Sequence, residues 1–221
     1  MAYLTDGFSA DVMIDRVQGV IKGGTATADE AVAVQFLNMA QLEMFHRKDW
    51  PELRIYDDYI TTDGSASYSL ATALNDAAKA GFGRVVEKSV RYGSFYLEPI
   101  TKKRYDLLDP GRTYGGTPQF YCASSRSDFR VLPYGSSGEK ISLDWVCLPV
   151  EIVAATDAAD ISYAPEHHEL IIEGAIWRAC REFKPDREWV EMQRAWYTRL
   201  DEAYKNSRQF RMSSFNVQPH H

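Results

Sequence analysis

The order of hydrophobic periodicities along the chain constrains its fold more than any single motif does. Helical spacing occupies both ends of the 221-residue sequence, and alternating, strand-like spacing occupies residues 54–150 between them. The first helical part ends at residues 50–53, and helical spacing returns at Ala164. Since helices and strands must bury their apolar faces against each other, the two ends are expected to meet around the inserted strands. The order predicts an α+β protein: N- and C-terminal helices in a helical bundle, with an inserted antiparallel β-sandwich or barrel-like domain.

Two helices are predicted in residues 1–53. Ser9 can cap a helix near residues 10–22. Thr27 can open a second helix through a capping box, and this helix runs to about Lys48. The Trp50-Pro51 pair then ends it, because the residue before a proline is pushed out of the α region.

The middle part reads as several short strands separated by turns. The clearest covers residues 140–148, where apolar and polar side chains alternate. Asp63-Gly64 has the composition of a hairpin turn between residues 56–62 and 67–70. Further strands are predicted over residues 84–91, 94–97, 119–123 and 129–132. This pattern favours an antiparallel sandwich or barrel over a parallel sheet.

Residues 151–207 are assigned to the C-terminal helices of the bundle, with a polar connector over residues 150–163 before the first of them. Pro165 suits the first position of a helix, and Gly174 would let a neighbouring helix approach closely. A short break at Lys184-Pro185-Asp186 predicts an antiparallel helix pair. The predicted helix-junction residues are Trp50, Pro51, Pro165, His167 and Gly174. The last residues, 208–221, show no period and are expected to form an extended tail.

Composition narrows the functional classes. The chain carries 31 Asp and Glu against 25 Lys and Arg, for a net charge of −6, and its densest basic run is only Lys102-Lys103-Arg104. A net negative charge and one short basic run are not typical of a nucleic-acid-binding protein, which usually carries an extended basic surface. The three cysteines lie far apart without a CxxC motif, so buried thiols in a reducing compartment are expected. No signal peptide and no apolar run long enough for a membrane span are found, so we expect a protein that is kept in the cytoplasm or assembled there into something that leaves later.

No catalytic constellation emerges from the motifs. His167 and His168 are adjacent, about 100° apart on a helix, so they cannot chelate one ion together; helix-start packing with one outward histidine is expected. Ser136 lies outside any GxSxG elbow. The acidic pairs Asp57-Asp58 and Asp157/Asp160 could serve as acid/base or calcium-binding carboxylates, but solvated loop acids are the favoured interpretation. We predict no enzyme activity, no metal and no cofactor.

Four segments, in order, resemble the head-to-tail adaptor (connector) proteins of tailed bacteriophages, in the form with a β-domain inserted in a helical bundle. They are residues 37–53, residues 59–62 with 68–70, residues 116–121 with 129–133 and 141–145, and residues 164–175. Together they span roughly residues 10–205. One departure is Ser69-Leu70-Ala71, which stands where such proteins tend to show a Leu-Pro pair.

The resemblance implies a structural virion protein at the head–tail interface, or neck. Such a protein binds beneath the dodecameric portal in twelve copies, extends the DNA channel and presents a surface to tail or neck proteins. It also implies that a C-terminal extension docks onto the portal, which assigns that role to Phe210, Arg211, Met212, Phe215 and Val217. A ring of such acidic chains, with about 72 negative charges, would repel DNA and let it slide without sequence-specific binding.

Two alternatives stay open at this stage. One is another neck or tail completion protein of the same architecture, distinguished by the ring that it binds directly. The other is a carbohydrate-binding or carbohydrate-cleaving β-domain protein. That protein would line a groove with aromatic side chains from the Tyr-rich middle and would use Asp57, Asp58, Asp157 or Asp160. Bracketing helices would be unneeded for the second alternative.

Overall fold

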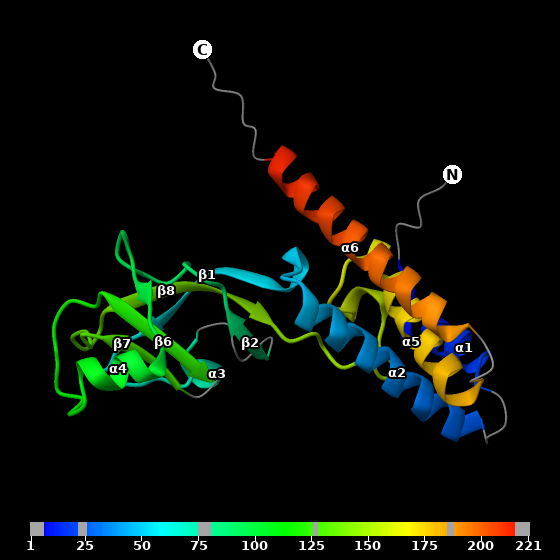
Figure 1. Cartoon of the computed structure of the whole chain (residues 1–221), viewed down its shortest axis with the longest axis horizontal. Coiled ribbons are helices and arrows are strands. Elements are labelled where there is room, and N and C mark those ends of the chain that lie inside the picture. The colour runs from blue at the N-terminus through cyan, green and yellow to red at the C-terminus, as the bar shows by residue number, and fades with distance from the viewer. Residues whose placement is uncertain (1–6, 22–25, 75–80, 126–127, 185–187, 215–221) are drawn as a thin grey trace, which may run out of the picture. The chain divides into compact units, whose positions relative to one another are not determined.

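A computed structural model describes residues 7–21, 26–74, 81–125, 128–184 and 188–214 (Figure 1). The chain divides into two compact units, one of residues Met1–Leu53 and Pro149–His221 and the other of Arg54–Leu148. We call them the helical unit and the β unit. The predicted α+β class is confirmed. The barrel-like prediction is wrong, because the described strands form two open sheets.

The helical unit is held together by α2, which packs against both α1 and α5, while α6 packs on α5. Its elements are α1 (Ala10–Gln18), α2 (Ala26–Arg47), η1 (Pro51–Leu53), η2 (Ala158–Asp160), η3 (Pro165–His167), α5 (His168–Phe183) and α6 (Trp189–Ser214). The loop after the β unit lies along α2. The Asn38 side chain bonds both the backbone N–H and the carbonyl of Ile152, each at 2.9 Å, and Gln41 donates to the Val150 carbonyl at 2.8 Å.

The N-terminal helix boundaries differ from the predicted ones. α1 ends at Gln18, before the predicted end at residue 22, because the chain tightens there into a turn in which Val20 N donates to Val17 O at 3.0 Å. α2 begins at Ala26, one residue before the predicted cap Thr27. Helix ends are the least determined part of a periodicity pattern.

The C-terminal segment is the largest correction in the helical unit. α6 continues to Ser214, so residues 208–214 are helical and the prediction of an extended tail from residue 208 is wrong for them. The reason lies in the sequence: no Gly or Pro interrupts the chain between Trp189 and Ser214, and a helix that is already nucleated extends at little cost. Residues 215–221 lie outside the described part of the chain.

The β unit is organised around its last strand. The elements are β1 (Arg54–Thr61), α3 (Leu70–Ala73), β2 (Phe82–Val85), β3 (Arg91–Tyr92), β4 (Phe95–Tyr96), β5 (Glu98–Pro99), α4 (Lys102–Leu108), β6 (Phe120–Ser125), β7 (Asp128–Leu132) and β8 (Lys140–Cys147). β8 pairs antiparallel with β1 on one side and with β2 and β3 on the other, and β4 extends the sheet from β3. In the second sheet β6 lies between β5, which is parallel to it, and antiparallel β7.

Strand β8 confirms the clearest prediction in the middle of the chain, whereas the predicted Asp63-Gly64 hairpin is wrong. β1 takes β8 as its partner, and residues 67–70 form no strand beside β1: Tyr68 bridges to Phe129, and Leu74 forms a single bridge to Ile60. The remote pairing joins apolar side chains that alternate in both strands, such as Ile60 opposite Ile141, each fully buried. Burial of a shared apolar face therefore outweighs the local turn signal.

A helix was not predicted over residues 102–108, where α4 forms. Thr101 caps it, with its Oγ1 accepting a hydrogen bond from Arg104 N at 3.3 Å. Tyr105 points inward and is fully buried with Ile100, Cys122 and Leu132, so α4 packs on the second sheet. This packing turns the other face of α4 to solvent.

Candidate interaction surfaces

Of the predicted helix-junction residues, Trp50 and His167 lie in contact, whereas Gly174 lies apart from them, against Ala40 and Trp196. Trp50 is fully buried, and its Nε1 donates to the Met44 carbonyl at 2.9 Å, which fastens the chain to the end of α2. The rings of Tyr163, His167 and Tyr204 lie edge-on to it, with centroids 4.8–5.7 Å away. Pro165 begins η3, the turn that leads into α5. The junction thus joins three parts of the chain in one aromatic cluster.

Both histidines of the junction are buried, so the expectation of one outward histidine is wrong. His167 is 4% exposed, with Nδ1 3.0 Å from the Glu52 carboxylate. His168 is fully buried: its Nδ1 accepts from Phe8 N and its Nε2 donates to the Tyr163 carbonyl, each at 3.0 Å. Burial lowers the pKa of His168 below its ordinary value. The pair therefore packs the start of α5 in place of presenting a ligand to solvent.

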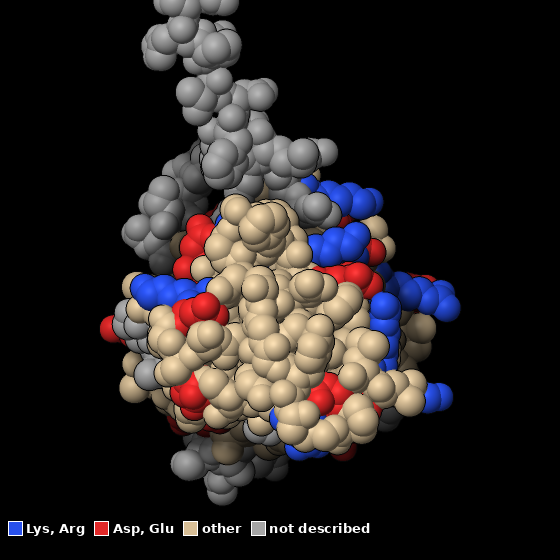
Figure 2. Space-filling view, turned by 90° about the vertical axis from the view of Figure 1, so that its left-hand side faces the viewer, with Lys and Arg blue, Asp and Glu red and all other residues tan. Residues whose placement is uncertain are grey.

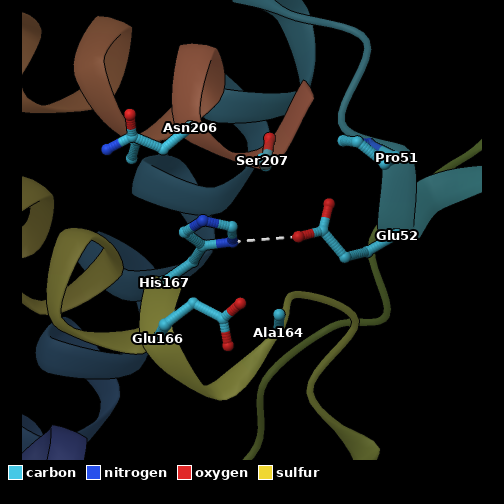
Figure 3. Close-up of a pocket in the computed structure, with 8 residues that line it drawn as sticks. Pro51, Glu52, Ala164, Glu166, His167, Asn206 and Ser207 are labelled. Atoms are coloured by element: carbon cyan, nitrogen blue, oxygen red, sulfur yellow. Dashed lines mark ion pairs between the residues drawn. The ribbon is translucent and has the colours of Figure 1, made fainter. Parts of the chain in front are cut away.

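An open cleft of about 520 Å³ lies beside this junction in the helical unit (Figure 3). Its lining residues are Pro51, Glu52, Ala164, Glu166, His167, Ala203, Asn206 and Ser207. Figure 3 shows Glu52 and His167 directed toward each other, with Asn206 and Ser207 contributed by α6. The cleft gathers two carboxylates and one imidazole, but the imidazole is engaged by Glu52. Among the described residues, no group of three or more His, Cys, Asp or Glu is placed to hold a metal ion.

A buried ionic network ties α2, α5 and α6 together. The Arg178 guanidinium is 3% exposed and bonds both the Glu43 carboxylate and the Gly174 carbonyl. Tyr197 donates to the same carboxylate at 2.7 Å. Gly174 is required nearby, because a Cβ there would lie 2.8 Å from the Cβ of Ala40 and 2.9 Å from the Trp196 ring. The network thus holds α6 against α2 and α5 within the helical unit.

Between Ala31 and Leu42, the exposed side chains of α2 carry no charge, which is unusual for an exposed helix. We call this surface the α2 stripe; its exposed residues are Ala31, Gln35, Met39 and Leu42, and the basic residues His46 and Arg47 follow in the last turn. Exposed Val150 and Val153 come from the loop that Asn38 and Gln41 hold against the same helix. An exposed helical face is ordinarily polar and charged, so an uncharged stripe of this kind is typical of a surface that another protein covers.

A second exposed apolar cluster lies on the β unit, at the end of α4, with the exposed basic residue Arg112 beside it. We call it the α4 face: Leu107, Leu108 and Tyr114 are 74%, 50% and 58% exposed. The Asp109 carboxylate accepts from Thr113 N and Tyr114 N at 3.0 and 3.1 Å, which folds the following loop back beside the helix end. Figure 2 looks onto this end of the β unit and shows uncharged side chains over most of its centre, with charged ones toward the margins.

A third exposed apolar cluster is the tip of the β3–β4 hairpin. Phe95 and Tyr96 are 72% and 67% exposed, and the turn residue Gly93 has the positive φ of 58° that favours glycine. Sequence reasoning missed both the hairpin tip and the α4 face. Two sequence features could have drawn attention to these clusters: the Leu107-Leu108 doublet before Asp109-Pro110, and the uncharged run of residues 92–97. Neither feature indicates whether its side chains are exposed or buried in the fold.

The predicted portal-docking residues are only partly described. Phe210, Arg211 and Met212 lie in the last turns of α6, while Phe215 and Val217 lie outside the described residues.

The acids invoked for a carbohydrate enzyme do not form one site within either unit. Asp58 is 4% exposed and accepts from Trp145 Nε1 at 2.9 Å, whereas neighbouring Asp57 pairs with Arg91 on the surface.

The comparisons with known proteins place the chain in a family of structural proteins. No helix of the described residues is both long and apolar enough to cross a bilayer. No curated protein matches the chain significantly. The family model described as SU10 adaptor protein matches residues 9–219, nearly the whole sequence, and confirms the resemblance. Adaptor proteins of this kind are structural virion components that contact other head or tail proteins. The chain therefore belongs to the SU10 adaptor protein family and is a phage adaptor protein.

Proposed function

We propose that this chain forms the head-to-tail connector ring of its phage: it binds the portal, extends the DNA channel and offers an attachment surface to tail or neck proteins. The family match over residues 9–219 is the observation that carries the proposal. Exposed apolar side chains in both units support it, because clustered apolar side chains on a surface are typical of protein contacts.

The helical unit makes the contacts with neighbouring copies in this proposal, with about twelve copies in the ring. The α2 stripe supports this part. Met39 and Leu42 are 41% and 40% exposed on a helix whose remaining faces are packed, and covering them would release ordered water from an apolar surface.

The C-terminal end of α6 docks onto the portal. Phe210, Met212, Phe215 and Val217 supply apolar anchors, and Arg211 supplies a cation; a segment of this composition gains contacts when a partner's groove receives it. Helical backbone through Ser214 indicates that the anchors at Phe210 and Met212 are presented from a helix.

Deleting residues Phe210–His221 tests this docking. The deleted segment lies beyond Trp196 and Leu200, the residues of α6 that are buried in the core, so the remaining protein should keep its unfolding temperature. Its affinity for a purified portal ring, measured by surface plasmon resonance, should fall at least about tenfold, which corresponds to about 1.4 kcal/mol.

The matched control is the full chain with Ser213→Ala and Ser214→Ala, which alters the same segment without removing an apolar anchor. It should bind the portal like the unmodified chain. Unchanged portal binding by the truncated protein would remove the C-terminal segment from the proposal.

The channel role makes a separate prediction. A chain with net charge −6 should not grip the polyanion that passes it. Fluorescence anisotropy with duplex DNA at 150 mM salt should show no binding tighter than about 10⁻⁴ M, the weak limit of ordinary non-specific binding. A micromolar affinity that weakens steeply with salt would contradict a passive channel.

A further inference from the structure

The open cleft of about 520 Å³ beside the aromatic junction has walls of two kinds (Figure 3). Three small residues, Pro51, Ala164 and Ala203, give it apolar surface, while η1, η3 and α6 also contribute polar side chains. All of the lining belongs to the helical unit. Walls of both kinds suit an elongated ligand group with an apolar stem and a polar head.

His167 turns one ring nitrogen toward a partner and the other toward α6. The residue is 4% exposed, and its Nδ1 lies 3.0 Å from the Glu52 carboxylate. Because a carboxylate favours the proton on the nitrogen that faces it, Nε2 keeps a lone pair. Figure 3 shows this second nitrogen on the side of the ring that faces Asn206, and no residue of the described chain hydrogen-bonds to it. A buried acceptor of this kind calls for a donor from another molecule.

Other polar groups of the cleft are acceptors as well. Glu166 is exposed, and no Lys or Arg of the described chain pairs with its carboxylate. The Ser207 hydroxyl donates to the Tyr204 carbonyl at 3.0 Å, which leaves its lone pairs for accepting. Together with Glu52, the described lining holds two carboxylates and neither Lys nor Arg. Such a lining attracts a cation that carries hydrogen-bond donors and repels an anion.

A guanidinium group fits this set of acceptors better than other cations do. Its N–H donors lie in one plane, so they can reach the His167 Nε2 and a carboxylate at the same time. The methylene stem of an arginine is apolar, as are the walls formed by Ala164 and Ala203. A metal ion is disfavoured, because the described residues place no group of three or more His, Cys, Asp or Glu to hold one.

The place of the cleft along α6 indicates which protein supplies the arginine. Asn206 and Ser207 come one helical turn before Phe210, the first residue of the proposed portal-docking segment. Position 210 is only about 6 Å further along the helix axis than position 206. A portal surface that receives the end of α6 therefore also lies beside the cleft.

We propose that the cleft receives an arginine side chain of the portal protein. Its guanidinium bonds His167 Nε2 and the Glu166 carboxylate, and its stem packs on Ala164 and Ala203. This contact rests on the proposed connector function and adds a charged, directional contact at the base of the docking segment. Contacts of this kind fix the register of an interface, whereas apolar anchors supply most of its buried area.

Charge reversal at the exposed edge of the cleft tests the contact in the full-length chain. Glu166→Lys puts a cation where the guanidinium is expected to bind, so the affinity for a purified portal ring should fall at least about tenfold in surface plasmon resonance. Glu191→Lys makes the same charge change in the first turn of α6 and should bind like the unmodified chain. Both acids are exposed, so both variants should keep the unfolding temperature.

A second pair of variants tests the stem without changing the charge. Ala203→Phe fills the apolar part of the cleft and should also lower the affinity for the portal ring at least about tenfold. Ala195→Phe adds the same side chain at an exposed position of the same helix, outside the cleft lining, and should leave the affinity unchanged.

An Arg→Ala scan of the portal ring identifies the partner group. One portal variant should lose about as much affinity for the unmodified chain as Glu166→Gln loses for the unmodified portal. Combining the two changes should cost little more than either change alone, because both remove the same contact.

Unchanged portal binding by both Glu166→Lys and Ala203→Phe would overturn this inference and leave the connector function standing. So would a scan in which the effect of every portal arginine simply adds to that of Glu166→Gln. If the unmodified chain does not bind the portal ring at all, the connector function fails and this inference fails with it.

Discussion

At the scale of single residues, the stability of the helical unit depends on buried polar groups that have partners. Arg178 is the clearest case, because its guanidinium is buried against Glu43 and between the rings of Trp177 and Trp196. Arg178→Ala would leave the Glu43 carboxylate without its buried cation and should lower the free energy of unfolding by roughly 3 kcal/mol. Arg181→Ala, on the exposed side of α5, should change it by less than about 0.5 kcal/mol. Urea titration compares the two; equal effects would contradict a special role for Arg178.

His168 makes the stability depend on pH. Burial lowers its pKa in the folded state, so the unfolded state binds a proton more readily. The stabilising contribution of neutral His168 is therefore complete above the ordinary histidine pKa of about 6.5 and is lost as the pH falls below it. His168→Gln should flatten the fall in the urea midpoint between pH 7 and 5. An identical pH profile in the variant would refute this account.

At the scale of elements, the strands of the five-stranded sheet differ in how well they are anchored. β8 is bordered on both sides, whereas β4 is a two-residue strand at the sheet edge. In hydrogen-exchange mass spectrometry of the free chain, residues 142–146 should exchange at least about a hundredfold more slowly than residues 93–96. Comparable rates would contradict the central position of β8.

The sequence predicted elements where its pattern is long and self-consistent. Strand β8 alternates over eight residues and α2 keeps helical spacing over 22, and both were recognised. The pairing of β1 with β8 was not recognised, because β8 lies about 80 residues later in the chain and the pairing depends on tertiary packing. The residues of a local turn do not encode such packing. The hairpin tip and the α4 face were missed for a related reason: whether Leu107 is buried or exposed depends on which side of α4 Tyr105 anchors.

At the scale of the whole molecule, the chain is an adaptor built from two compact units that each expose apolar side chains. The α2 stripe on the helical unit is the surface proposed to be covered by neighbouring copies. A structural protein acts by binding other proteins, and it binds them more tightly when its contact surfaces are already ordered, because ordering them on binding costs free energy. Asn38 and Asp109 provide that order, the first along α2 and the second at the α4 face.

Native mass spectrometry of the chain mixed with a purified portal ring from the same phage tests the central claim most directly. The connector account predicts one dominant complex whose mass exceeds that of the portal ring by a full ring of adaptor chains, twelve for a dodecameric portal. A mixture in which the portal ring keeps its own mass and the chain stays monomeric would contradict the account and favour a component that binds elsewhere in the tail.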